Sequence, residues 1–278
     1  MQRTIMSTVG LFLLLTIFTT ITACSSSQSY SSSTQTSSGN TSTSNTQTSS
    51  GNTSNGNSET RDFTISGGTQ PTLIVNNDVG SVNVQTGSNS NNVHIKVTKS
   101  GDNPSDIQTN YSQSGTTITV TIKRINPNSN AKADADITLP NKSDLQLQDG
   151  TGDITVTGIE GKMLLTNGTG SINATQATLT SNSQLQTGTG SVNFSGSIGS
   201  GNYQFQSSTG NVNVSLPSNA SFHVNANTNV GGITSDFPGV ATQTNIVGAS
   251  ATGDVGSAPS TTTITLTTNT GSIHLQKH

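Results

Sequence analysis

The chain repeats the unit Gly152-Asp-Ile-Thr-Val156 as Gly170-Ser-Ile-Asn-Ala174, Gly190-Ser-Val-Asn-Phe194 and Gly210-Asn-Val-Asn-Val214. These four copies begin 18, 20 and 20 residues apart, and more distant copies start at Gly80 and Gly271. A second short apolar segment and a turn precede each unit, as in Met163-Leu-Leu165 and Tyr203-Gln-Phe205. A period near 20 residues is typical of β-structure built from stacked or meandering repeats.

Side-chain alternation within the unit predicts one buried and one exposed column. Successive side chains of a strand point to opposite faces, so the Ile or Val two positions after the glycine faces a core. Stacked copies would align Ile154, Ile172, Val192 and Val212 inside, and Thr155, Asn173, Asn193 and Asn213 outside. The predicted structural turn glycines are Gly152, Gly170, Gly190, Gly210 and Gly271, because such turns need a positive φ.

Two architectures fit this pattern, a parallel β-solenoid and an antiparallel hairpin meander, for which Asn167-Gly168 is a signal. We expect the solenoid, because strands this short bury little surface unless similar rungs stack into a continuous core. The predicted fold class is all-β, with β-solenoid repeats of about 20 residues preceded by a short-strand β capping region. We expect Ser235 to Ser260 to be a loop inserted into a rung, and Lys277 and His278 to blunt the last strand.

The N-terminus predicts export and lipid attachment. Arg3 precedes an apolar run from Val9 to Phe18, and the single cysteine, Cys24, follows Ile21-Thr-Ala23. This arrangement resembles the bacterial lipobox, which implies cleavage before Cys24 and a lipid on its sulfur. We expect a lipoprotein signal peptide over residues 1–23 and a head anchored on the extracytoplasmic side of the bacterial membrane. An ordinary secretory signal with a chance cysteine is the alternative.

Composition divides the rest of the chain. Residues 24–60 are almost entirely Ser, Thr, Asn, Gln and Gly, which predicts a disordered linker. Residues 61–278 are the expected all-β domain, with first-half strands over 61–140 and solenoid repeats over 141–278. In the first half we expect strands over 73–75, 81–85, 93–98, 117–123 and 135–139.

Charge and residue types narrow the function classes. Only 8% of residues are charged, and no Lys or Arg lies between Met163 and Gln276, so a nucleic-acid surface is not expected. The four histidines lie far apart in sequence, and we expect no metal site and no cofactor. Asp149 and Asp153 could bind a weak calcium ion, but a turn-stabilising role is the stronger interpretation. The paired carboxylates and bases of a β-helix hydrolase or lyase are missing from the repeats.

The successive Gly-Ser/Asp-Ile/Val units, and Asp136-Ile-Thr-Leu-Pro140 before them, resemble the bacterial putative-adhesin β-strand-repeat family, a domain of unknown function. The resemblance spans Asp62 to His278. It implies a β-solenoid-like fold and supplies no catalytic residues.

These observations predict a non-catalytic envelope or cell-surface lipoprotein that acts by adhesion or surface interaction. Its expected partners are the membrane, through the lipid on Cys24, and an unidentified surface polymer or cell-surface partner. Three alternatives stay open: an envelope sensing or regulatory module, a degraded β-helix polysaccharide-active enzyme, and binding of ice or a mineral by flat Thr and Asn ladders.

Overall fold

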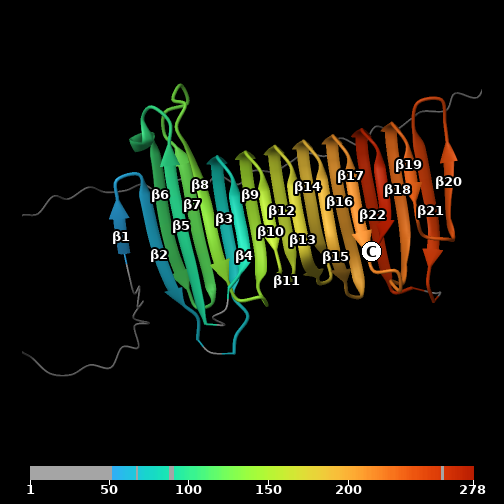
Figure 1. Ribbon diagram of the computed structural model, residues 1–278, viewed down its shortest axis with the longest axis horizontal. Helices are drawn as coiled ribbons and strands as arrows, with labels where there is room; N and C mark the ends of the chain where they lie inside the picture. Colours follow the sequence, from blue (N-terminus) through green and yellow to red (C-terminus); the bar gives the residue numbers. More distant parts are fainter. Residues whose placement is uncertain (1–51, 67, 88–90, 258–259) are drawn as a thin grey trace, which may run out of the picture. The chain divides into compact units, whose positions relative to one another are not determined.

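The computed structural model describes residues 52–66, 68–87, 91–257 and 260–278. These residues belong to one compact unit and form two large mixed β-sheets, with no α-helix among them (Figure 1). Within these ranges no helix has the length and apolar character needed to cross a membrane. The predicted signal peptide, Cys24 and the linker as far as residue 51 lie outside the described residues.

In the described part of the chain, one sheet has twelve strands and the other has eleven. The twelve-stranded sheet runs β1 (Asn52–Asn55), β2 (Ser58–Thr64), β5 (Asn92–Ser100), β8 (Lys132–Leu139), β4 (Val82–Thr86), β10 (Ile154–Thr157), β13 (Ile172–Leu179), β15 (Val192–Ile198), β17 (Val212–Leu216), β23 (Ile273–Lys277) and β19 (Ile233–Ser235), with β11 (Glu160–Gly161) beside β13. The eleven-stranded sheet runs β20 (Val240–Thr244), β21 (Ala249–Val255), β18 (Phe222–Val230), β22 (Thr262–Thr270), β16 (Gly201–Thr209), β14 (Ser183–Thr189), β12 (Met163–Thr169), β9 (Asp144–Thr151), β3 (Thr72–Val79), β7 (Thr117–Arg124) and β6 (Ile107–Ser114). A 3-10 helix, η1 (Pro104–Asp106), precedes β6.

The repeats pair in parallel, as the solenoid interpretation requires. A rung is here a strand of the eleven-stranded sheet followed, after a corner glycine, by a strand of the twelve-stranded sheet. Val192 pairs with Ile172 on one side and with Val212 on the other, at the predicted 20-residue offsets. The antiparallel meander is therefore wrong for these units. The sheets themselves are open, and each mixes parallel with antiparallel pairs. The antiparallel pairs lie at the β1 end of the twelve-stranded sheet and at both ends of the eleven-stranded sheet.

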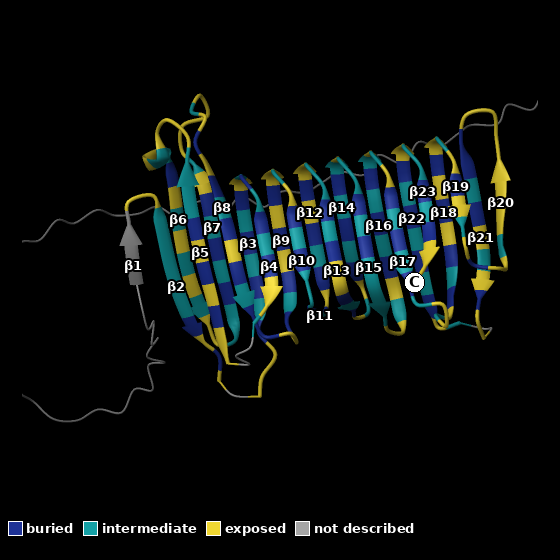
Figure 2. Cartoon of the chain, viewed as in Figure 1, coloured by how far each residue is buried: buried dark blue, intermediate teal, exposed yellow. Residues whose placement is uncertain are grey.

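Alternating burial along the strands places the core between the two sheets. Figure 2 shows buried residues alternating with less buried ones along the strands. The predicted inner column, Ile154, Ile172, Val192 and Val212, is fully buried. Phe194 of one sheet and Phe205 of the other meet at a centroid distance of 5.4 Å. Tyr203 is 2% exposed, and its hydroxyl donates to the Leu179 carbonyl at 3.2 Å.

The order of the rungs in space departs from their order in the chain at both ends. The last rung of the chain, β22–β23, lies between β16–β17 and β18–β19. The expectation that Lys277 and His278 blunt the end of the stack is therefore wrong, because β23 is an interior strand. At the other end, the rung β3–β4 likewise lies between the rung β9–β10 on one side and the strands β7 and β8 on the other.

The segment from Ser235 to Ser260 is not the single inserted loop that its composition predicted. It contains the antiparallel hairpin β20–β21, and β21 pairs with β18 to extend the eleven-stranded sheet. Ala249, Ala251 and Val255 alternate along β21 and are buried. Small residues have low strand propensity, so their alternation predicted a strand only weakly. The strand forms here because it pairs with β18.

Ordered strands also begin earlier than the boundary predicted at residue 61. β1 and β2 form an antiparallel hairpin around Gly56 and Asn57, with Asn55 paired to Ser58. Gly56 has a φ of 62°, as a tight two-residue turn requires. The five strands expected in the first half are present: four have longer bounds, and β4 is shifted by one residue from the predicted 81–85. The strands β2 and β6 were not predicted.

Candidate interaction surface

The outer face of the twelve-stranded sheet carries a self-paired ladder of asparagine amides. Asn193 donates to the Asn173 side chain at 2.7 Å, and Asn213 donates to Asn193 at 2.6 Å. The predicted outer column of Thr155, Asn173, Asn193 and Asn213 is thus in register on this face. These bonds run from rung to rung, so the ladder stabilises the stacking of the rungs.

The outer face of the eleven-stranded sheet carries a different ladder, made mainly of glutamine, threonine and asparagine. One of its columns contains Gln148, Thr166, Gln186, Gln206, Thr267, Asn227, Ser250 and Gln243 in successive paired strands. Gln184 donates to Gln186 at 3.0 Å, and Gln204 donates to Gln206 at 3.1 Å. These bonds run along a strand and use one donor and one acceptor of each pair, so further hydrogen-bonding groups face outward.

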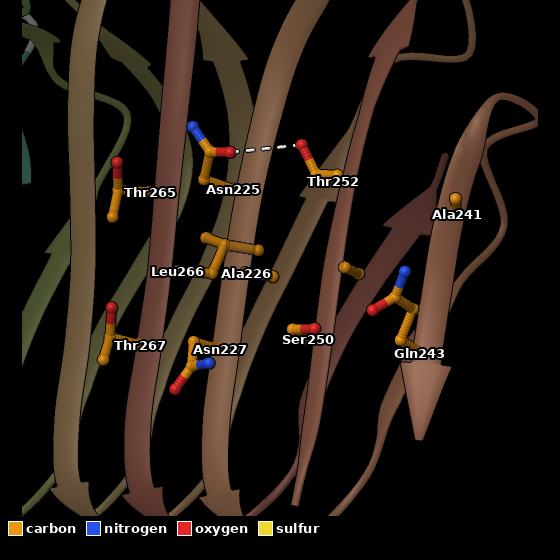
Figure 3. Close-up of a pocket in the computed structure, with 11 residues that line it drawn as sticks. Asn225, Ala226, Asn227, Ala241, Gln243, Ser250, Thr252, Thr265, Leu266 and Thr267 are labelled. Atoms are coloured by element: carbon orange, nitrogen blue, oxygen red, sulfur yellow. Dashed lines mark hydrogen bonds between the residues drawn. The ribbon is translucent and has the colours of Figure 1, made fainter. Parts of the chain in front are cut away.

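The groove on this face is hollowed across the four strands β22, β18, β21 and β20, and it has a volume of about 290 Å³. Figure 3 shows Thr265 and Thr267 on one side, Asn225 and Asn227 beside them, and Gln243 on β20 across the groove. The Thr252 hydroxyl donates to the Asn225 side-chain oxygen at 3.2 Å. The side chains lining the groove are all uncharged, and none is aromatic.

The chemistry that this groove offers is hydrogen bonding by neutral amides and hydroxyls. Such groups donate and accept, so they match a ligand that carries many hydroxyl or amide groups and no strong charge. Its lining contains no carboxylate, imidazole, thiol or ammonium group to act as a base, acid or nucleophile. Sequence reasoning predicted neutral outer ladders but not the groove, because the hollow depends on the unpredicted hairpin β20–β21.

The five predicted turn glycines stand at the corners between the two sheets. Gly190 shows why the position excludes a side chain: its φ is 132°, and a Cβ there would lie 2.2 Å from the carbonyl oxygen of Gly170. The same close approach to the neighbouring rung recurs at the other four, Gly152, Gly170, Gly210 and Gly271. The sequence predicted the positive φ at these positions. The structure adds a second reason for glycine, because a Cβ would collide with the carbonyl oxygen of the neighbouring rung.

A buried polar side chain three residues before each corner glycine binds a neighbouring rung. Thr187 donates to the Gly170 carbonyl at 2.7 Å, and Ser207 donates to the Gly190 carbonyl at 2.7 Å. The equivalent donors are Asn167 to Gly152, Thr268 to Gly210 and Thr228 to Gly271. Each of these side chains is a hydrogen-bond donor, so the column satisfies corner carbonyls that would otherwise be buried without a partner.

Asp149 lies at the equivalent position, three residues before Gly152, but its side chain accepts a hydrogen bond where the others donate one. It is 1% exposed, accepts a 3.1 Å hydrogen bond from the Asn77 amide at Oδ1, and has no partner at Oδ2. Burial raises the pKa of Asp149 to about 7, against hydrogen bonds from Asn77 and nearby backbone amides that lower it. A Cβ on Gly152 would lie 2.0 Å from the Gly80 carbonyl oxygen and 2.8 Å from Asp149 Oδ2, so both oxygens border one corner.

The other acids and histidines named from the sequence are dispersed. Asp153 Oδ1 accepts the Ser171 backbone N–H at 2.7 Å, so this hydrogen bond joins two neighbouring rungs instead of closing the turn that contains Asp153. His223 pairs with Asp254 at 2.8 Å on the surface. Across the described ranges, no group of three or more His, Cys, Asp or Glu side chains could hold a metal ion.

A partly buried polar cluster joins the two sheets near the N-terminal end of the described residues. Glu59 on β2 lies 2.5 Å from the Lys99 ammonium and accepts hydrogen bonds from Thr109 and Tyr111 on β6. Burial alone would raise the pKa of Glu59, but the hydrogen bonds from Lys99 and Thr109 and the Lys99 charge lower it overall. This cluster was missed because its members come from strands far apart in sequence.

The comparisons with known proteins found no matching family model and no matching curated protein. Among solved structures, a putative cell adhesion protein from Clostridium sporogenes is 15% identical, with a TM-score of 0.49 over 80% of this chain and 100% of that chain. A putative adhesin from Bacteroides fragilis is 12% identical, with a TM-score of 0.36 over 81% and 98%. A putative lipid binding protein from Parabacteroides distasonis is 12% identical, with a TM-score of 0.25 over 81% and 98%. At these identities and TM-scores, the likenesses transfer no function to this chain.

Proposed function

We propose that this chain is a non-catalytic surface-interaction protein that contacts neutral, hydroxyl-rich or amide-rich polymers through the outer face of its eleven-stranded sheet. The observation that carries the proposal is the groove across β22, β18, β21 and β20, lined by uncharged amides and hydroxyls. The remaining columns of the face repeat the same groups from rung to rung. A polymer with a repeating unit can therefore make many weak contacts, and these add without one strong site.

A catalytic function has less support, because the carboxyl group with the most perturbed pKa is out of reach of the outer face. Asp149 has a pKa near neutrality, which is a common property of catalytic carboxyls, but it is 1% exposed and faces a corner of the stack. A substrate on the outer face cannot reach it without opening the rungs.

Variants of the groove test the proposal directly. The Cys24→Ser chain should be retained on some immobilised neutral polysaccharides, and Gln243→Glu should weaken retention because it places a carboxylate in the uncharged groove. Gln85→Glu is the matched control, since Gln85 is an exposed glutamine on the other sheet. Equal retention of both variants, or no retention on any neutral polymer, would contradict the groove as the contact site.

We also propose that the chain is a lipoprotein whose head is a two-sided β-solenoid held outside the membrane by Cys24. Support for the anchor is the lipobox-like sequence before Cys24, and support for the solenoid is the parallel register of successive rungs. Cells expressing Cys24→Ser should incorporate no labelled fatty acid into the chain, because the thioether cannot form. Equal labelling of wild type and variant would refute the anchor.

A further inference from the structure

The C-terminal rung fills a slot between two rungs that precede it in the chain. β16–β17 and β18–β19 are both complete before β22–β23 is reached, yet they do not pair with each other. Instead β22 pairs in parallel with β16 on one side and with β18 on the other, and β23 pairs with β17 and β19. Removing Thr262–Lys277 would leave four strand edges facing an empty slot.

The contacts that hold this rung are the same as those of the other rungs, and they do not depend on the covalent connection between β21 and β22. Ile264 and Leu266 are fully buried at the inner positions of β22. The Thr268 hydroxyl donates to the Gly210 carbonyl at 2.8 Å, and Thr228 donates to the Gly271 carbonyl at 2.8 Å, so the corner bonds are made on both sides. A segment with the same sequence would therefore fit the slot equally well if it came from another molecule.

We propose that the slot is an interaction site for a second copy of this chain, in which Thr262–Lys277 of each copy occupies the slot of the other. Exchange of an identical segment keeps the same contacts in the slot. Its free-energy cost is therefore mainly that of bringing two chains together. Parallel strand addition supplies main-chain hydrogen bonds, and the inner side chains set the register. The exchanged rung carries Thr265 and Thr267, so each groove would then be built from two chains.

Disulfide trapping tests the exchange between full-length chains in a Cys24→Ser background. Gln204 pairs with Thr265 across β16 and β22, and both side chains lie on the outer face. Neighbouring strands are about 4.8 Å apart, a separation within the range that a disulfide spans. A Gln204→Cys chain and a size-tagged Thr265→Cys chain, unfolded together and refolded at high concentration, should form a disulfide-linked heterodimer.

The matched control replaces Gln204→Cys by Gln146→Cys, which lies on the same face but on β9, with β12, β14 and β16 between it and β22. We expect several-fold less heterodimer with this partner. An excess of a peptide covering residues 260–278 should also reduce trapping with Gln204→Cys. The single-chain variant with both Gln204→Cys and Thr265→Cys must form its internal disulfide, which shows that the refolded geometry is correct. Equal heterodimer with both partners, while that internal disulfide forms, would overturn the proposal.

Discussion

The central rungs and the two ends of the described fold are stabilised in different ways. From β9 to β17 the rungs follow chain order, pair in parallel and repeat the same buried column and corner bonds. Towards the ends, the strands depart from chain order, and the outermost pairs are antiparallel everywhere except at the β19 end of the twelve-stranded sheet. These regions depend on side chains that occur once. Examples are the Glu59–Lys99 pair and the Phe222–Phe237 contact, whose ring centroids are 5.2 Å apart. Repetition stabilises the middle, whereas individual residues close the ends.

The sharpest contrast between the two regions is expected from a pair of glycine-to-alanine substitutions. Gly190→Ala in the centre combines a φ of 132° with a contact of 2.2 Å to the Gly170 carbonyl oxygen. Gly115→Ala, in the β6–β7 turn, has a φ of 60° and no atom within 4 Å of the new Cβ. We expect Gly190→Ala to lower the free energy of unfolding by about 3 kcal/mol or more and Gly115→Ala by about 1 kcal/mol. Urea unfolding of both variants measures this, and similar losses would mean that the rungs separate easily.

The N-terminal closure should respond to removal of one charge. Lys99→Met leaves the Glu59 carboxylate, 18% exposed, without its cation, and we expect a loss of about 2 kcal/mol in the free energy of unfolding. Adding Glu59→Gln should recover part of that loss, because no unpaired charge then remains. A double-mutant cycle by urea unfolding checks this, and simple additivity of the two losses would show that the pair is not coupled.

Asp149 offers a smaller, pH-dependent contrast within the central rungs. Its folded-state pKa of about 7 lies above the ordinary value of 3.8, so the folded chain binds the extra proton between these values. The free energy of unfolding should therefore fall as pH rises from about 4 to about 7 through this group, and stay low above that range. Asp149→Asn resembles the Asn167 corner and should remove this part of the slope and raise stability at pH 8. Urea unfolding across pH measures it, and an unchanged slope would show that Asp149 is not the group responsible.

The difference between the regions also explains what the sequence could predict. The glycines and the Ile or Val column predict which residues face the core in the middle rungs, because a shift by one residue would expose the whole column. They left both the parallel and the antiparallel arrangement open. The placement of β22–β23 between two earlier rungs could not be predicted from the sequence. Ile273 pairs with Val212 on one side and with Ile233 on the other, and the apolar residues of the rungs are too alike to specify which rungs are neighbours. The hairpin β20–β21 was missed because its inner residues are small, and the groove depends on that hairpin. Cys24 lies outside the described residues, so its lipid attachment stays a prediction.

A single assay distinguishes contact with a polymer from its cleavage. The Cys24→Ser chain is incubated with each immobilised neutral polymer that retains it, and new reducing ends are counted in the same samples. We predict retention with no increase in reducing ends over the buffer control. An increase that disappears in Asp149→Asn or Asp153→Asn would contradict this account and identify the chain as a polysaccharide-cleaving enzyme.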